Sequence, residues 1–204
     1  MAPKLKYTRE EMIQMGLSII KESGIEALTA RNMAKRLNIS TQPLFTCFGS
    51  MEEFQAEVYE YVEILFHERT QAGLKADTPF LGYGKAYIQF AREEPELYRL
   101  LFLNNKKQGY LKVMKDAQDL IRPSLQEIYH IDAKSADFYY SNMWLVVHGI
   151  ASLIVTDCCP YSDEEIGKIM MGFSLSICQS IKTIPGFVDS HYDGYALYKK
   201  MVGE

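Results

Sequence analysis

The chain has 204 residues, 48% of them hydrophobic, and a formal net charge of −4 at pH 7. This length suits one large domain or two small ones with an ample core. Residues 1–9 are basic and polar, unlike a signal peptide, and the most apolar run, residues 143–155, is shorter than the roughly 20 residues of a membrane span. The four cysteines have no CxxC spacing, so we expect reduced thiols in a soluble, cytoplasmic protein that does not associate with membranes.

The charge is distributed unevenly along the chain. Residues 1–50 contain seven basic and four acidic residues, a net +3, whereas the remainder contains 15 basic and 22 acidic residues, a net −7. A basic head on an acidic chain is typical of a protein that touches nucleic acid with one end. A charge run can also be a solvated face, so this feature counts only together with a binding motif.

The first predicted helix begins with a capping box formed by Thr8 and Glu11. We expect Gly24 to end it as a left-handed cap. Three apolar positions recur at helical spacing and should face a core: Ile13, Leu17 and Ile20. The basic arm before this helix, which contains Lys4 and Lys6, could reach a phosphate or the minor groove, or could be a frayed terminus.

Residues 29–48 have the pattern of a helix-turn-helix. Thr29 is a predicted N-cap of a short helix ending near Leu37, and Asn38 follows at a tight turn. Ser40 is then expected to cap a second short helix, in which Leu44 and Phe48 belong to the core. In such motifs the second helix lies in the major groove and its first residues meet the base edges.

The expected DNA contacts follow from the chemistry of the exposed positions. Gln42 suits adenine N6 and N7, and Thr41 and Thr46 can donate or accept. Ser40 and the free N–H groups at the helix start can bind phosphate. Arg31, Lys35 and Arg36 add attraction to the phosphate backbone. The whole predicted contact set is Thr29, Arg31, Lys35, Ser40, Thr41, Gln42, Pro43, Phe45, Thr46 and Met51.

These residues give the first quarter of the chain a specific resemblance. The motifs Gly24, Thr29 with Met33-Ala34, Ser40 with Leu44-Phe45 and Phe48, and Ser50-Met51-Glu52 with Phe54 resemble the DNA-binding domain of the TetR family of bacterial repressors. Two positions depart from the family pattern: Phe45 replaces the usual Tyr, and Met51 the usual Lys. The resemblance implies phosphate contacts by that Tyr and that Lys, and neither residue type is present at these positions here.

The remainder of the chain also has a helical pattern. A capping box at Ser50 opens a helix to about residue 72, with Phe54, Val58, Tyr61 and Leu65 on one stripe. Thr78-Pro79 starts the next helix, Pro95 opens another, and Pro123 should kink or split a helix that ends near residue 129. Two long helices are predicted over about 133–158 and 162–184, the second capped by Ser162 and carrying an apolar side formed by Ile166, Ile169, Met170, Phe173 and Ile177. The aromatic tail, residues 187–204, should pack on another surface and not extend freely into solvent.

A second resemblance covers about residues 80–180. Tyr87-Ile88, Phe90-Ala91, Pro95 and Tyr98-Arg99-Leu100, followed by Trp144, His148 and Gly149, are similar to a C-terminal domain type of TetR-like regulators known for a Trp, a His and a Gly. It implies a body that binds a small-molecule effector and forms a homodimer through the helices at about 133–158 and 162–184.

The predicted effector site is a set of aromatic residues with one histidine: Tyr87, Tyr98, Phe102, Tyr140, Trp144 and His148. Trp144 and His148 could stack on and hydrogen-bond to a ligand in a pocket between helices. His148 could equally be a core histidine with a partner. An aromatic stripe at helical spacing is more often core than pocket.

No catalytic motif, phosphate-binding loop or metal site is predicted, so we expect no enzyme, no cofactor and no bound metal. His148 and Cys159 are about 16 Å apart along one straight helix, too far to share an ion. Cys158 and Cys159 could form a thiol switch at the helix end.

The sequence therefore predicts an all-α protein of about nine helices. A three-helix DNA-binding domain over residues 6–66 should precede a helical ligand-binding and dimerisation domain over 74–204. The expected function is that of a ligand-responsive homodimeric repressor on a palindromic, double-stranded DNA operator. The alternative is a helical protein-interaction module with a weakened DNA-binding head, which the residues at Phe45 and Met51 motivate.

Overall fold

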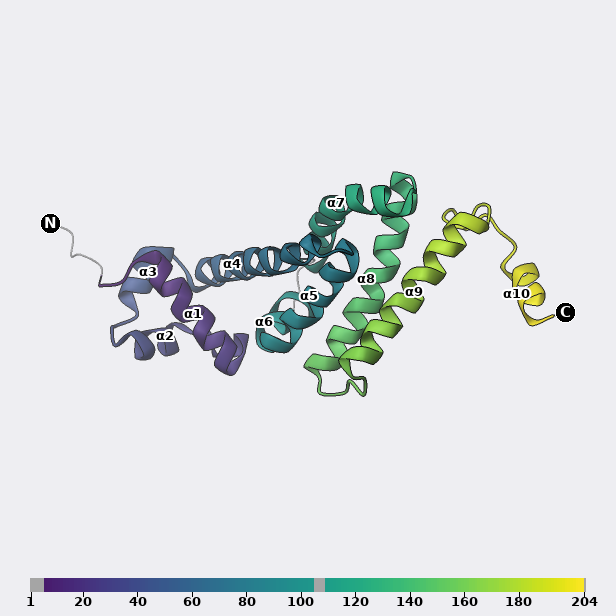
Figure 1. The fold of residues 1–204 in the computed structure, drawn as a ribbon. Helices are drawn as coiled ribbons and strands as arrows, with labels where there is room; N and C mark the ends of the chain where they lie inside the picture. The colour runs from purple at the N-terminus through teal and green to yellow at the C-terminus, as the bar shows by residue number, and fades with distance from the viewer. Residues whose placement is uncertain (1–5, 105–108, 204) are drawn as a thin grey trace.

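The computed structural model describes residues 6–104 and 109–203, and every element in these ranges is helical (Figure 1). The all-α expectation is confirmed. There are ten α-helices in the described ranges, one more than predicted, because the tail also forms a helix. The α-helices are α1 (Arg9–Ser23), α2 (Ala30–Leu37), α3 (Gln42–Phe48), α4 (Met51–Ala72), α5 (Pro79–Glu93), α6 (Pro95–Tyr98), α7 (Gly109–Tyr129), α8 (Ala133–Val155), α9 (Asp163–Thr183) and α10 (Gly194–Val202).

The head consists of α1, α2 and α3, packed around the first half of α4 (Figure 1). Thr8 and Glu11 form the predicted capping box of α1, and Thr29 caps α2 by accepting from the N–H of Asn32. Gly24 ends α1 at φ 76°, ψ 172°, so its φ is positive but its conformation is not the predicted left-handed helical one. Glycine is still favoured there, because a Cβ at this φ would be strained.

The start of α3 differs from the prediction. Thr41, not Ser40, is the N-cap residue, and no side chain caps the helix there. The reason is that Asn38 turns the chain in the left-handed region, at φ 52°, and α3 then begins at Gln42 with Pro43 in its first turn. The N–H groups at the start of α3 therefore receive no side-chain cap from the chain itself.

The helix α4 is continuous from the head to the body and crosses residue 66, where the sequence placed a domain boundary. Ser50 accepts from the N–H of Glu53, but only this half of the expected capping box forms, since the Ser50 N–H already donates to the Phe48 carbonyl. The buried stripe continues from Phe54 and Val58 through Val62 and Phe66. Tyr61 and Leu65, predicted on this stripe, are only half-buried, because the face toward α5 is one position further along.

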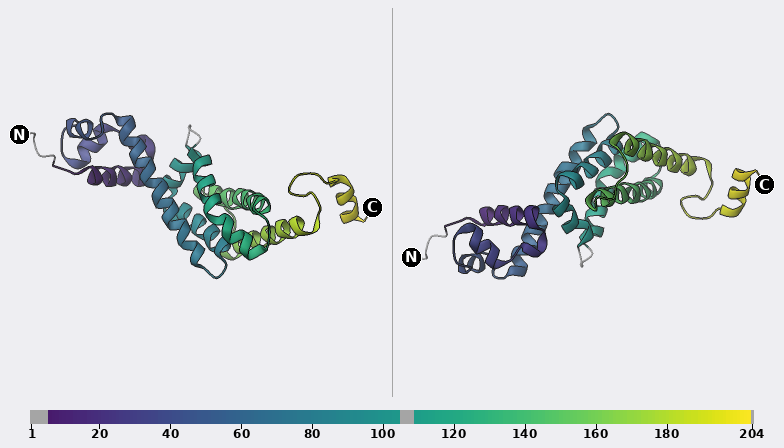
Figure 2. Two further views of the ribbon diagram at one scale, coloured as in Figure 1. Left: turned by 90° about the horizontal axis from the view of Figure 1, so that it is seen from above. Right: turned by 90° about the horizontal axis from the view of Figure 1, so that it is seen from below.

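The body packs α5 against both α4 and α8, with α7 and α9 on either side of α8 (Figures 1 and 2). After α6 the chain continues as a π-helical turn, η3 (Arg99–Leu103). A 3₁₀ turn, η2 (Gly73–Lys75), joins α4 to α5, and another, η1 (Ile25–Ala27), follows α1. Pro123 lies inside α7 and does not split it.

The helix α8 is 23 residues long and contains an 18-residue stretch with a mean hydropathy of 1.3, so by length and composition it could cross a membrane. The apolar run singled out in the sequence is only part of this helix. One side of α8 lies in the body core, with Ala136, Tyr139, Met143 and Val147 buried. Core packing accounts for that side without a membrane.

The outward side of α9 carries large apolar residues. Of its predicted apolar side, Ile166 and Met170 are buried, but Phe173 is 50% exposed. The buried residues of α9 are spaced four apart and continue from Ile166 and Met170 to Ser174. Phe173, one position before Ser174, therefore lies outside the buried face and is exposed. Exposed apolar residues of α8 and α9 together are Leu145, Leu153, Met171, Phe173 and Leu175.

The tail packs on the body only at its beginning, so the prediction for it holds in part. The Phe187 ring lies 5.5 Å from the Phe138 ring on α8. The helix α10, described along its whole length, contains no buried residue and lies apart from the other helices (Figures 1 and 2).

Candidate functional site

The outer face of α3 carries the polar residues expected to contact DNA. Leu44 and Phe48 are buried beneath it, while Thr41, Gln42 and Thr46 are exposed. The hydroxyl of Thr46 donates to the Gln42 carbonyl at 2.9 Å, whereas the side chain of Gln42 has no hydrogen bond in the described part of the chain. Gln42 is therefore the residue of α3 with the most hydrogen-bonding capacity left for a ligand.

Cations flank this face, but not all of them are available. Arg31 and Lys35 on α2 are exposed, and neither takes part in a salt bridge within the described residues. Arg36 pairs with Glu22, which lowers the pKa of that carboxyl. The sequence predicts that Arg36 attracts phosphate together with Arg31 and Lys35. In the structure its charge is partly balanced by Glu22, so it is less available to phosphate.

The remaining predicted contact residues lie around the same face. Ser40 and Thr29 are exposed, and Pro43 is half-buried in the first turn of α3. Phe45 is 37% exposed, so its ring is at the surface and not in the core. Met51 is half-buried against the core and has no charge with which to hold a phosphate.

Several contacts fix the helix-turn-helix in the head, one to Tyr7 before α1 and two to α4. The Tyr7 hydroxyl donates to the Leu37 carbonyl at 2.9 Å, and the Gln55 amide donates to the Leu28 carbonyl at 3.0 Å. The rings of Phe48 and Phe54 pack edge to face with centroids 4.7 Å apart. Any rotation of α4 must therefore carry α3 with it. Lys4, in the predicted minor-groove arm, lies outside the described residues.

A second polar cluster lies in the body, around His148 on α8. The hydroxyls of Tyr87 and Tyr98 lie 3.0 Å and 2.9 Å from His148 Nδ1. The Tyr98 hydroxyl is also 3.3 Å from Ser152 Oγ. His148 thus has the hydrogen-bond partners of a core histidine, the second of the two sequence interpretations, and lies among the aromatic residues of the first.

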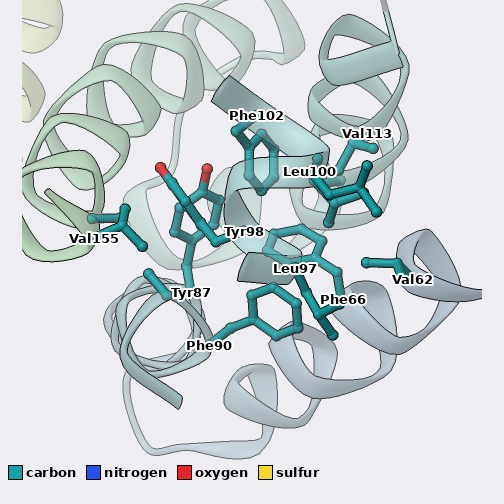
Figure 3. Packing of buried hydrophobic residues seen from close by; sticks show 14 of the residues in the cluster. Val62, Phe66, Tyr87, Phe90, Leu97, Tyr98, Leu100, Phe102, Val113 and Val155 are labelled. Carbon is teal, nitrogen blue, oxygen red and sulfur yellow. The ribbon is translucent and has the colours of Figure 1, made fainter. Parts of the chain in front are cut away.

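This cluster has more hydrogen-bond donors than the His148 ring nitrogen can accept. A neutral imidazole nitrogen accepts one hydrogen bond or donates one, so Nδ1 cannot accept from both tyrosines at once. Tyr98 has the Ser152 alternative, and the two hydroxyls lie side by side in the core (Figure 3). One hydroxyl in this cluster can therefore change partner without leaving a buried donor unpaired.

Aromatic rings surround the cluster closely. The Trp144 indole stacks on the His148 ring at 4.6 Å with an interplanar angle of 11°. Tyr87, Tyr98 and Phe102 are each less than a tenth exposed, while Trp144 and His148 are half-buried at the outer edge. The inner residues are packed against one another, so the cluster is accessible to solvent on the side of Trp144 and His148.

Burial sets the protonation of these groups. Burial lowers the pKa of His148 below its ordinary value of 6.5, which keeps the ring neutral at pH 7. Burial raises the pKa of Tyr98 to about 12 and that of Tyr87 well above 10.0. The cluster is therefore uncharged at neutral pH.

Tyr140, the sixth predicted ligand residue, differs from its neighbours. Its hydroxyl is buried and forms no hydrogen bond of normal geometry within the described residues, although it lies close enough to the Tyr83 hydroxyl to interact with it. Burial raises its pKa. A buried hydroxyl without a well-formed hydrogen bond is unfavourable, and a ligand acceptor could supply what the protein does not.

Phe66 connects the cluster to α4, a role that the sequence analysis missed. Its ring centroid lies 5.2 Å from each of the rings of Tyr87, Phe90 and Phe102 (Figure 3). The signal was present in the sequence, because Phe66 follows Val58 and Val62 at four-residue spacing.

Charged residues form a second connection between head and body. Glu94, just before α6, accepts from Lys21 of α1 at 2.7 Å and from Arg69 of α4 at 3.2 Å. The Glu94 side chain is only 11% exposed. The segment that begins at Glu94 also leads to Tyr98, so α6 touches both the head and the His148 cluster.

The cysteines and acidic residues do not gather into a further site. Within the described residues, no group of three or more His, Cys, Asp or Glu side chains could hold a metal ion. Cys158 is exposed and Cys159 half-buried, both as free thiols.

Two known sequence groups are similar to parts of this chain or to most of it. A family model described as "Tetracyclin repressor-like, C-terminal domain" matches residues 80–164. The uncharacterized HTH-type transcriptional regulator YobS of Bacillus subtilis (strain 168) is 22% identical over 180 residues, covering 87% of this chain and 92% of that protein.

Two solved structures are similar over most of the chain. A protein with unknown function from Rhodococcus sp. RHA1 matches with a TM-score of 0.67 and 15% identity, over 89% of this chain and 99% of that one. A TetR variant from Acinetobacter baumannii AYE, solved in complex with minocycline, matches with a TM-score of 0.53 and 14% identity, over 93% of this chain and 98% of that one.

Proposed function

We propose, for a chain whose fold is TetR-like and whose comparisons support the TetR family, that it is a ligand-responsive homodimeric repressor that binds a palindromic operator. The observation that carries the proposal is the outer face of α3. Gln42 and Thr41 are exposed at the start of this helix, while Leu44 and Phe48 fix it to the head. The TetR-like fold and the regulator relative support the same interpretation.

The start of α3 reads DNA in this proposal. Gln42 forms a bidentate contact with adenine in the major groove, and Thr41 binds a neighbouring base edge or phosphate. The N–H groups at the start of α3 face a phosphate, which completes their hydrogen bonds. Arg31 and Lys35, which have no salt-bridge partner within the described residues, add salt-dependent affinity.

The dimer forms through the outward faces of α8 and α9. Leu145 on α8 and Leu175 on α9 are 62% and 61% exposed, so large apolar side chains face solvent on both helices. Clustered exposed apolar residues mark interaction surfaces. A twofold pairing of these helices buries the cluster and places two α3 helices about 34 Å apart, one turn of DNA.

The effector site is the His148 cluster, and the body belongs to the Trp/His/Gly type. Trp144 offers a stacking surface, and the paired hydroxyls of Tyr87 and Tyr98 offer hydrogen bonds that can exchange partner. Tyr140 supplies a buried hydroxyl that forms no hydrogen bond of normal geometry among the described residues. The ligand class that fits is a flat, uncharged or weakly charged molecule with acceptor groups.

Binding of the effector changes the position of α4. A ligand that separates Tyr87 from Phe102 removes the surface on which Phe66 packs. The helix α4 then moves, and α3 moves with it through Phe54. The ligand favours this state only in so far as it binds it more tightly than the DNA-bound one.

The test is a fluorescence-anisotropy titration of the purified dimer on the DNA upstream of its own gene, with scrambled DNA at two salt concentrations. We expect selective binding. Gln42→Ala should lower the preference for particular base pairs by about 1–3 kcal/mol. The matched control is Gln14→Ala, an exposed glutamine of α1, which should leave the affinity unchanged.

The same titration separates the alternative function. Phe45 is partly exposed where the family pattern has Tyr, and Met51 has replaced a Lys, so a weakened head remains the competing hypothesis. If binding to both DNAs is equally weak and disappears as salt rises, the protein-interaction module is favoured and the repressor is excluded.

A further inference from the structure

The segment after α9 is held to the body at its beginning. Phe187 packs against Phe138 of α8, and Lys134, near the start of α8, pairs with Asp189. The Tyr192 ring lies 5.3 Å from the Phe187 ring. The backbone turns at Gly186, at φ 75°. The direction in which the chain leaves the body is therefore fixed by contacts and is not arbitrary.

The helix that follows has an apolar stripe that is exposed in the described structure, apart from the Lys199 ammonium, which lies 5.2 Å from the Tyr195 ring centroid. At 100° per residue, Tyr195, Tyr198, Met201 and Val202 fall within one third of the circumference of α10. Their exposed fractions are 68%, 58%, 85% and 51%. A nine-residue helix is marginal in water by itself, so packing of this stripe is needed to stabilise it.

The position of α10 indicates which surface can cover the stripe. In all three views α10 lies beyond α8 and α9, on the side away from α5 (Figures 1 and 2). A second copy packed on the exposed residues of α8 and α9 occupies that same side. The stripe is thus continuous with the apolar surface proposed for the dimer.

We propose that residues 184–203 form an arm that packs the apolar stripe of α10 onto the α8–α9 layer of a second copy of this chain. This inference rests on the homodimer of the proposed function. In a twofold dimer each copy gives one arm and receives one, so two arms clasp the same interface. The arm adds stability to a dimer whose centre is the pairing of α8 and α9.

The direct test is photo-crosslinking with p-benzoylphenylalanine placed at Tyr198. Protein labelled with ¹⁵N is mixed with unlabelled protein, subunits are allowed to exchange, and crosslinked peptides are sequenced by mass spectrometry. We expect mixed-isotope peptides that join α10 to α8 or α9. The control is the same probe at Phe45 on α3, which is also partly exposed and should give no link between copies.

Links confined to one isotope, or links from α10 to its own chain, would overturn the arm. Either result would mean that α10 folds back on its own body and leaves the dimer interface.

A truncation provides the quantitative test. Ending the chain after Ser190 removes α10 but keeps Phe187 and Asp189 in place. We expect the dimer dissociation constant, measured by sedimentation equilibrium, to rise about tenfold or more, which corresponds to about 1.4 kcal/mol. Circular dichroism should show that the truncated protein loses only about the helical signal of one short helix, so that the rest of the fold is kept.

A second variant distinguishes failure of the arm from failure of the dimer. Phe173→Glu places a charge in the α8–α9 surface and should give monomers. A full-length dimer whose dissociation constant is unaffected by the truncation would overturn the arm alone. A full-length chain that is monomeric at all concentrations would overturn both the arm and the proposed homodimer.

Discussion

The two ends of α4 lie in cores of different chemistry. In the head, Phe54 packs on Phe48 and beneath Gly16, where a Cβ would come within 2.9 Å of the Phe54 ring. In the body, Phe66 packs on rings of which one belongs to Tyr87, whose buried hydroxyl pairs with His148. Both phenylalanines are fully buried.

The difference indicates which half of the molecule can switch. The head core around Phe54 is packed by apolar groups that have one close-packed arrangement. The body core contains hydroxyls whose partners can be exchanged, and four of its tyrosines are at most 1% exposed: Tyr87, Tyr98, Tyr139 and Tyr140. A rigid head on an adjustable body suits the ligand-responsive regulator proposed above.

The largest effect is expected when the body end of α4 loses its ring. Phe66→Ala should lower the free energy of unfolding by about 3–5 kcal/mol, because it leaves a cavity between three aromatic rings. Urea denaturation followed by circular dichroism measures this. Ile64→Ala, at a position 50% exposed on the same helix, is the control and should cost less than about 1 kcal/mol. Equal losses for the two variants would mean that Phe66 does not join α4 to the body.

A pair of conservative variants tests the hydroxyls of the body core. Tyr87→Phe removes a hydroxyl that shares His148 Nδ1 with Tyr98, and Tyr98 can keep that nitrogen paired, so the loss should be about 0.5–1.5 kcal/mol, the net value of one hydrogen bond. Tyr140→Phe removes a buried hydroxyl that forms no hydrogen bond of normal geometry and should be neutral or stabilising. Thermal and urea unfolding of both variants and of the unmodified protein measure these changes in the free energy of unfolding. A larger loss at Tyr140 than at Tyr87 would contradict the assignment of the hydrogen bonds.

The stability of the protein should depend on pH through His148 in the body core. The folded-state pKa of His148 is lowered below 6.5, so between the two values the unfolded state binds more protons. Stability is therefore full above about pH 6.5 and falls as the pH drops through that window, by at most about 1.4 kcal/mol per pH unit for one proton.

Urea unfolding at pH 5 to 8 measures this slope, and His148→Gln should reduce it. Burial also lowers the pKa of His67, so part of the slope should remain in the variant. If His148→Gln leaves the slope unchanged, the proton taken up on unfolding binds to a group other than His148.

The smallest effect is expected at the polar contact between head and body. Lys21→Met removes one of the two cations on Glu94, and Lys21 is 40% exposed, so the loss should be about 0–1 kcal/mol. The expected change is in the midpoint of urea unfolding, and added salt should reduce the difference. A loss above about 2 kcal/mol would contradict this and show that the pair contributes as a buried ion pair does, not as a surface one.

Much of the head could be predicted from sequence, because its signals are local. Thr8 with Glu11 and Thr29 before Asn32 satisfy backbone N–H groups within a single turn, and such caps depend little on the rest of the fold. The prediction failed at Ser40, because the backbone turn places the N-cap of α3 at Thr41. At Ser50 the side-chain cap forms as predicted, and only the second half of the box is missing, because the Ser50 N–H donates to the Phe48 carbonyl.

The candidate effector cluster could be predicted only in part. The spacing of Trp144 and His148 places them on one face of a helix, and the structure stacks them there. That Tyr87 and Tyr98 share His148 Nδ1, across separations of 61 and 50 residues, follows from helix packing that periodicity does not encode. Phe66 was missed because its partners lie on other helices.

The sequence by itself therefore determined the helices, their caps and the helix-turn-helix, since these arise from hydrogen bonds and apolar spacing within a few residues. Tertiary structure alone decided which side of α9 is exposed, which hydroxyls find partners, and where α10 lies. These features depend on which helices become neighbours, and that choice is made by the burial of the whole core.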